Sequence, residues 1–269
     1  MLKKLIKYDL KYGAKIFIVI HALLWIAAIF GRVFFLDRID FDAPTEQLVS
    51  VLVLFFSAFV LLFSVVSLAT ALLIAARFYK NLFTDEGYLT WTLPASPVQQ
   101  LWAKILSGCI WNTLDLILLY SATYFMWISP NVQNAYRMIA AEFTASLGMP
   151  LSKFFLLMVL LSIIGVGSNV LMLYASISIG QLFPAHRLLL SVIVYFIFYM
   201  IIYALSMGAL IIFKLLPGIA LSANTVNEAA SMSTYLTGTF LISLVLSAVM
   251  AVIQYVITHL ILTRKLNLI

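Results

Sequence analysis

The sequence contains ten acidic residues, and one of them, Asp115, falls within a long apolar segment. A carboxylate near the middle of a membrane helix costs roughly 2.5–3.5 kcal/mol on insertion scales, so we expect Asp115 to face protein or water. Asn112 lies three residues earlier, on the same face of a helix, and Asn169 lies in another apolar segment. These three residues form a candidate intramembrane polar site, either as hydrogen-bond partners between helices or as the lining of a transport pathway.

The residue types needed for catalysis do not occur in the patterns that catalysis requires. His21, His186 and His259 are far apart and form no HExxH pair, and no glycine is followed by lysine, so no P-loop is present. The single Cys109 provides neither a disulfide framework nor a cysteine-rich metal site. We therefore expect no catalytic residue, no metal and no cofactor in this chain, and we expect His21 and His259 to form hydrogen bonds at the membrane interface.

The composition identifies the class of protein. The chain is 64% hydrophobic and 10% charged, with a mean hydropathy of +1.11, whereas soluble domains are about half apolar. The net charge of +6 does not indicate nucleic acid as a partner, because the basic residues cluster beside the apolar segments. The expected partner is the lipid bilayer, and the chain is expected to cross a membrane several times.

The apolar segments predict an all-α polytopic fold with six transmembrane helices. The predicted spans are 16–36, 48–76, 105–128, 154–183, 188–213 and 238–262. The predicted outer loops are 37–47, 129–153 and 214–237, and a short helix is expected over Ala135–Leu147 within the second of them. Segment 77–104 and the short turn 184–187 are predicted on the cytoplasmic side.

The first fifteen residues predict an amphipathic helix that lies at the membrane interface before the spans begin. Lys3, Lys7, Lys11 and Lys15 are spaced four apart, on one side of a helix, and leucine and isoleucine occupy other positions. A cleavable signal peptide is the alternative, but no small-residue cleavage site precedes a soluble region. Residues 16–269 are then one six-helix transmembrane domain.

The distribution of positive charge predicts which side each loop occupies. Eleven of the sixteen Lys and Arg residues fall on the side of both termini and five on the other, which fits the positive-inside rule. Both termini are therefore predicted to be cytoplasmic. The first group is Lys3, Lys4, Lys7, Lys11, Lys15, Arg77, Lys80, Lys104, Arg187, Arg264 and Lys265, and the second is Arg32, Arg38, Arg137, Lys153 and Lys214.

Segment 77–104 interrupts the apolar sequence with polar and aromatic residues. Ser96, Pro97 and Gln99 have the pattern of a capping box with proline at the first helical position, so a helix should begin there. Gly87 is expected to end the preceding helical piece, and Pro94 prevents one continuous helix.

The aromatic and apolar residues of this segment need an explanation, because they follow the membrane span and would face water. Tyr88, Leu89, Trp91 and Leu93 either lie in the headgroup layer, where Trp and Tyr are common, or contact a cytoplasmic partner. Both interpretations remain open at this point.

Two stretches carry a resemblance to a known family. The string FYKNLFTDEGYLTWTLPASPVQQLWAKI resembles the first cytoplasmic loop of small bacterial ABC transporter permeases of the type-2 export family. The string SISIGQLFPAHRLL, between the fourth and fifth spans, is similar to the second cytoplasmic turn of the same family. The layout of an interfacial helix and six spans is also similar.

The resemblance implies a multi-pass protein of the bacterial plasma membrane, a permease subunit of an ATP-driven exporter of amphipathic substrates such as antimicrobial peptides, drugs or lipids. ATP and magnesium would be bound by a separate ABC ATP-binding subunit, and a second permease copy or paralogue would complete the transporter. The implied ATPase-coupling residues are Leu82, Phe83, Asp85, Glu86, Gly87, Tyr88, Leu89 and Trp91. The alternative is a non-transporting membrane sensor or assembly partner that binds a cytoplasmic regulator through segment 77–104.

Overall fold

The computed structural model describes residues 1–41, 45–215 and 232–264, and this part of the chain is helical with no strand. The elements in order are α1 (Leu2–Phe34), the 3-10 helix η1 (Leu36–Arg38), α2 (Thr45–Phe83), α3 (Asp85–Trp91), α4 (Pro97–Trp127), α5 (Pro130–Leu147), α6 (Leu151–Gly180), α7 (Arg187–Ile212) and α8 (Met232–Arg264). Six helices, α1, α2, α4, α6, α7 and α8, are long and apolar enough to cross a membrane. The predicted all-α fold with six candidate spans is confirmed.

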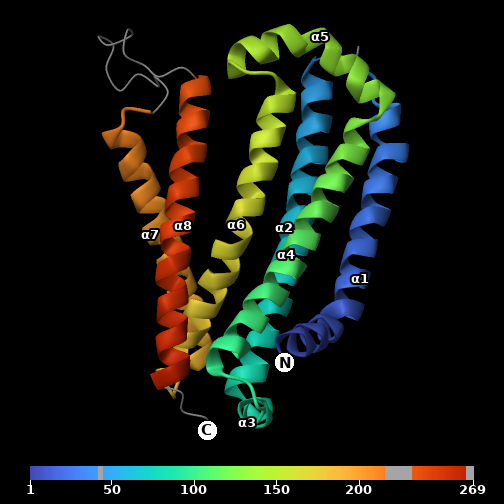
Figure 1. Ribbon diagram of the computed structural model, residues 1–269. Coiled ribbons are helices and arrows are strands. Elements are labelled where there is room, and N and C mark those ends of the chain that lie inside the picture. The colour runs from blue at the N-terminus through green and yellow to red at the C-terminus, as the bar shows by residue number, and fades with distance from the viewer. Residues whose placement is uncertain (42–44, 216–231, 265–269) are drawn as a thin grey trace.

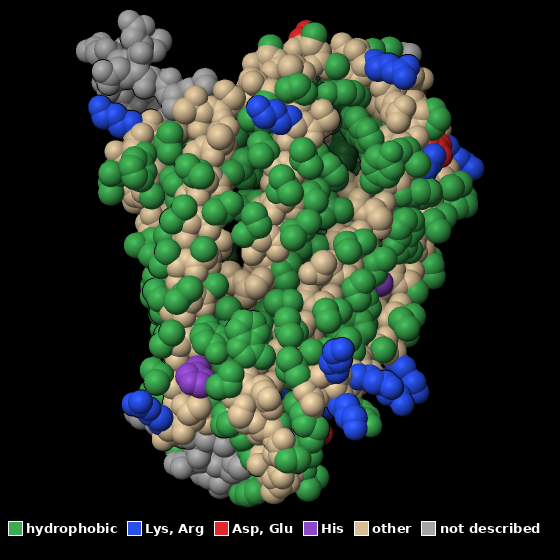
Figure 2. All heavy atoms as spheres, viewed as in Figure 1, with side chains coloured by type: hydrophobic (Ala, Val, Ile, Leu, Met, Phe, Trp, Pro, Cys, Tyr) green, Lys and Arg blue, Asp and Glu red, His purple; other side chains and the backbone are tan. Residues whose placement is uncertain are grey.

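The outer surface of the bundle is apolar. Large hydrophobic side chains such as Leu61, Ile212 and Val252 are more than 60% exposed. Figure 2 shows apolar side chains over the middle of the bundle, with most of the visible Lys and Arg toward its two ends. A surface of this size would be unfavourable in water, so the fold suggests a multi-pass membrane protein.

Two groups of helices meet at a shared junction (Figure 1). Helix α1 packs on α4 and α2, and α6 packs on α7 and α8, while α4 and α2 also contact α6. The largest buried cluster forms at this junction and includes Phe78 and Leu82 of α2, Leu101 of α4 and Tyr174 of α6. The rings of Phe78 and Tyr174 stack with their centroids 3.9 Å apart. This junction lies at the end of the bundle that carries α3.

Helix α1 includes both the predicted interfacial segment and the first span. Figure 1 shows its first turns lying across the end of the bundle before α1 continues along α4. Lys3, Lys7, Lys11 and Lys15 are all exposed. That this part of α1 lies at a membrane interface stays a prediction.

The structure places several boundaries differently from the sequence. Segment 77–104 is not a loop, because α2 continues to Phe83 and the segment also contains α3 and the first turns of α4. The prediction that Gly87 ends a helix was wrong: Gly87 lies inside α3, where it is buried, and Thr84 separates α2 from α3. The capping box at Ser96 and Gln99 is confirmed, and α3 ends before Pro94.

The remaining differences concern the connections. Helix α5 starts at Pro130, earlier than expected, because the proline occupies the first helical position. The turn predicted at 184–187 is the 181–186 connection between α6 and α7. Here a Cβ atom on Gly180 would lie 2.7 Å from the Arg187 carbonyl oxygen, so the approach of the two helices requires glycine. Most of the predicted loop 214–237 lies outside the described residues, as does Lys265, although α8 already includes residues 232–237.

Figure 1 places the N-terminus and the end of α8 at the same end of the bundle as α3, opposite α5. The assignment of these ends to sides of a membrane is a prediction from charge. A cysteine replacing Glu46 at the start of α2 and one replacing Ser96 before α4 should react with a membrane-impermeant maleimide from opposite sides. The measurement is labelling of intact cells against opened cells, in a Cys109→Ala background. Labelling of both positions from one side would contradict the six-span arrangement.

Candidate functional site

The candidate partner-binding surface is α3, the seven-residue helix between the two long helices α2 and α4. A helix this short is not stable alone, so its position depends on tertiary contacts. The Trp91 indole N–H donates to the Leu82 carbonyl oxygen at 3.2 Å, and the buried Gln100 side chain donates from Nε2 to the Thr90 carbonyl oxygen at 2.9 Å. These bonds attach the C-terminal half of α3 to both long helices.

The residues proposed for ATPase coupling divide between two faces. Asp85, Glu86, Tyr88 and Leu89 are exposed, and Leu89 is 73% exposed. Leu82, Phe83 and Gly87 are buried, and Trp91 packs half-buried against the junction cluster. Trp91 is covered by the chain itself and by neither of the two expected surroundings, because α3 is amphipathic and Trp91 lies on its inner face. The exposed face alone is available to a partner.

A charged cluster joins α1, α2, α3 and α4 beside this helix. Asp9 of α1 is 4% exposed and accepts hydrogen bonds from Arg77 Nε at 3.0 Å and from Lys104 Nζ at 2.5 Å. Arg77 also pairs with Glu86 of α3 at 3.1 Å, and its guanidinium lies 4.3 Å from the centre of the Tyr12 ring. Arg77 therefore links the exposed helix α3 to the buried carboxylate of α1.

Sequence reasoning missed Asp9, although a signal was present. The four lysines spaced four apart in the first fifteen residues define one side of α1, and Asp9 lies about 200° around the helix from Lys7, on the opposite side. An acid on the side opposite the charged stripe of an amphipathic helix should be buried against cations. Arg77 and Lys104, at the ends of two predicted spans, were the available partners.

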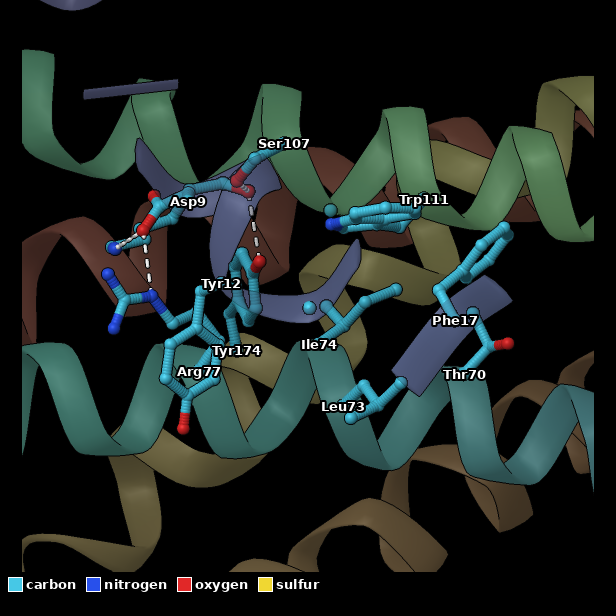
Figure 3. Close-up of a pocket in the computed structure, with 13 residues that line it drawn as sticks. Asp9, Tyr12, Phe17, Thr70, Leu73, Ile74, Arg77, Ser107, Trp111 and Tyr174 are labelled. Atoms are coloured by element: carbon cyan, nitrogen blue, oxygen red, sulfur yellow. Dashed lines mark hydrogen bonds and ion pairs between the residues drawn. The ribbon is translucent and has the colours of Figure 1, made fainter. Parts of the chain in front are cut away.

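A narrow cavity of about 20 Å³ extends from this cluster into the bundle. Figure 3 shows Asp9 and Arg77 toward one end of the lining and Phe17 and Thr70 toward the other, with Tyr174 and Ser107 from α6 and α4 beside the Asp9 end. The hydroxyl groups of Ser107 and Tyr174 both donate to the Lys104 carbonyl oxygen, at 3.0 and 2.9 Å. Their oxygen atoms retain the capacity to accept hydrogen bonds.

Asp115 lies in the interior, 2% exposed, with partners from two other helices. Its Oδ1 is 2.8 Å from His21 Nε2 and accepts from the Thr70 hydroxyl at 3.0 Å, and its Oδ2 accepts from the Ser67 hydroxyl at 2.9 Å. The second ring nitrogen of His21, Nδ1, is 2.9 Å from the Phe17 carbonyl oxygen. Asp115 therefore faces protein, as expected, and whether it also lines a transport pathway stays a prediction.

One expectation about this polar site was wrong, and the role of its two asparagines stays a prediction. His21 does not lie at the interface but is 3% exposed inside the bundle, because α1 starts far beyond the predicted span and places His21 level with Asp115. Within the described residues, Asn112 and Asn169 are half-buried and neither is a hydrogen-bond partner of Asp115. In the described ranges, no three His, Cys, Asp or Glu side chains lie close enough together to hold a metal ion.

The chain matches no protein-family model, no curated protein and no solved structure. The geometry of α3, of the Asp9 cluster and of the Asp115 site therefore carries the functional argument.

Proposed function

We propose that this chain is the transmembrane permease subunit of an ATP-driven ABC exporter, and that it pairs with a separate ATP-binding subunit and a second permease copy or paralogue. The cargo would be an amphipathic molecule such as an antimicrobial peptide, a drug or a lipid. The observation that carries the proposal is α3, a short amphipathic helix held at the end of the bundle between two long helices. The resemblance of residues 78–105 to the corresponding permease loop gives this helix its proposed role.

The exposed face of α3 has the chemistry of a docking surface. Tyr88 and Leu89 offer apolar area, and Asp85 and Glu86 offer negative charge toward a basic groove. Interface energy is concentrated in a few such anchors, and aromatic residues are enriched among them. The inner face keeps the helix fixed, so a force applied to α3 would act on the ends of α2 and α4.

The Arg77 contacts provide a route from α3 to a third helix. Displacement of Glu86 would change the position of Arg77, which also binds Asp9 of α1. Since Asp9 contacts Lys104 of α4 as well, α1, α2 and α4 share one charged junction with α3. In the proposed transporter, closure of the ATPase subunits would act on the helices through this junction.

Changing Tyr88 and Leu89 together to alanine should remove the ATPase from the purified permease. Both side chains are exposed, at 50% and 73%, so the bundle should stay folded, while loss of two interface anchors should lower ATPase recovery by about tenfold or more. The measurement is mild-detergent purification of the tagged chain from its native membrane, with quantitative mass spectrometry. Trp91 is left unchanged because its indole supports α3 from inside.

The matched control is Met138→Ala with Ile139→Ala, a pair of exposed apolar residues on α5 at the opposite end of the bundle. This pair should leave ATPase recovery unchanged. Full recovery of the ATPase with the α3 variant would contradict the coupling role of this helix. A regulator or kinase recovered in place of an ATPase, and lost with the same variant, would establish the sensor interpretation.

A further inference from the structure

The contact between His21 and Asp115 requires a proton that can be located by elimination. The Phe17 carbonyl oxygen only accepts, so Nδ1 of His21 must carry a hydrogen to bond it at 2.9 Å. The opposite nitrogen, Nε2, lies 2.8 Å from Asp115 Oδ1, and two lone pairs facing each other at this distance would repel. One further proton therefore lies between Nε2 and Oδ1, on the imidazole or on the carboxyl group.

The hydroxyl groups around Asp115 favour the arrangement with the proton on His21. Thr70 donates to Oδ1 and Ser67 donates to Oδ2, so each carboxylate oxygen has a hydroxyl donor in addition to His21. Hydrogen bonds to the charged form of a carboxyl group favour that form. Loss of the shared proton would leave a neutral imidazole lone pair against a carboxylate, so the hydrogen bond between His21 and Asp115 exists only while the proton is bound.

A cavity with Asp9 and Arg77 at one end and Thr70 at the other reaches this pair from the end of the bundle that carries α3. Thr70, which binds Asp115, also lines the cavity that extends to Asp9 (Figure 3). The cavity measures about 20 Å³, and about 10–15 Å³ is enough for one water molecule. At its other end, Asp9, Arg77 and Lys104 also line a hollow of about 210 Å³ beside α3.

The buried carboxylate of Asp9 indicates that the cavity holds a polar ligand. Its Oδ1 binds Arg77 and Lys104, while its Oδ2 is buried and has no hydrogen-bond partner in the part of the chain that the structure describes. A carboxylate oxygen in the interior needs a donor, and a water molecule is small enough to reach it here.

We propose that His21 and Asp115 form a proton-binding site inside the bundle, and that a water molecule entering the cavity between Asp9 and Thr70 from the α3 end exchanges protons with this site. The proton moves between water in the cavity and His21 Nε2, with Thr70 at the junction. The bound state is the imidazolium–carboxylate pair, and the released state is neutral His21 beside ionised Asp115. This site requires no ATP-binding partner and is independent of the exporter assignment.

The charged and titratable groups near the site are few. Facing the pair itself are the uncharged hydroxyls of Ser67 and Thr70 from α2, His21 from α1 and Asp115 from α4. The other titratable groups lining the cavity are Asp9 and Tyr12 from α1, Arg77 from α2, Lys104 from α4 and Tyr174 from α6. A change in the protonation of His21 is therefore expected to depend on Asp115 before any other group.

The test is ¹⁵N NMR of the histidine rings in the purified full chain in lipid nanodiscs. The chain has three histidines, so a His186→Gln, His259→Gln background leaves the His21 signal alone. We expect Nε2 to carry a proton in the Asp115 protein and none in the Asp115→Asn variant when both are measured at the same pH, because the asparagine amide can donate to Nε2 and the carboxylate cannot. Identical protonation of His21 in both proteins would overturn the site.

The route is tested by proton exchange at Nε2, measured from the exchange broadening of the same signal. Thr70→Val preserves the side-chain shape but removes the hydroxyl between the cavity and the pair, and we expect exchange about tenfold slower. Ser67→Ala is the matched control, because it removes one donor from the other carboxylate oxygen and Ser67 does not line the cavity. Equal exchange rates in the two variants would overturn the route.

Discussion

Replacing Asp9 with alanine is expected to lower the free energy of unfolding by about 3–5 kcal/mol, the range found when one member of a buried ion pair is removed. The reason is that Lys104, 5% exposed, would lose the carboxylate that it binds, and Arg77 would keep only its pair with the exposed Glu86. The loss should separate the first turns of α1 from α2 and α4, since Asp9 binds a cation from each of them.

The measurement is unfolding of the purified chain by SDS in mixed micelles, followed by circular dichroism. Asp85→Ala is the matched control: it removes an acid from the same end of the bundle, but Asp85 is exposed on α3 and its loss should cost less than about 1 kcal/mol. A similar loss of stability in both variants would mean that Asp9 is not the anion on which the junction depends.

A double variant separates the loss of charge balance from the loss of volume. Lys104→Met preserves the length of the apolar stem and removes the ammonium group, so combining it with Asp9→Asn should cost less than the sum of the two single changes. Additive effects would contradict a direct interaction between Asp9 and Lys104.

The sequence predicts the helices of this protein better than it predicts their ends. Membrane helices are specified by a strong and local signal, the length of an apolar segment, so six spans follow directly from composition. Helix ends depend on whether polar residues find tertiary partners. The last turns of α2 could not be predicted because they are stabilised by the burial of Phe78 and Leu82 in a cluster with α4 and α6.

The candidate site shows the same division between local and tertiary information. The capping box at Ser96 is local and was predicted correctly, and Asp115 was predicted as a buried acid because its cost in an apolar segment is evident from one helix. Its partner His21 lies 94 residues away, and no spacing rule connects them. Asn112 was chosen because it is close in sequence, but a membrane helix pairs its polar groups with those of neighbouring helices.

Changing Asp115 to leucine is expected to lower the free energy of unfolding by about 3 kcal/mol. Ser67 and Thr70 can turn their hydroxyl groups to carbonyl oxygens of their own helix, but His21 has no such alternative for Nε2. Asp115→Asn should cost only about 1 kcal/mol, because the asparagine amide can donate to Nε2 while its oxygen accepts from Thr70 or Ser67. Unfolding in mixed micelles compares the two variants directly.

The decisive comparison is with the double variant His21→Leu, Asp115→Leu. Asp115→Leu should lower the free energy of unfolding because it leaves the His21 imidazole without a partner. Removing that imidazole should then restore most of the stability, since replacing both partners of a buried polar pair by apolar groups is often close to neutral. Suppose instead that Asp115→Asn and Asp115→Leu lower the free energy of unfolding equally and the double variant recovers no stability. The shape of residue 115, and not its hydrogen bonding, would then determine its effect on stability. Recovery in the double variant would instead show that the bundle can fold without this polar pair. The pair would then serve a purpose other than stability, and binding and release of a proton is such a purpose.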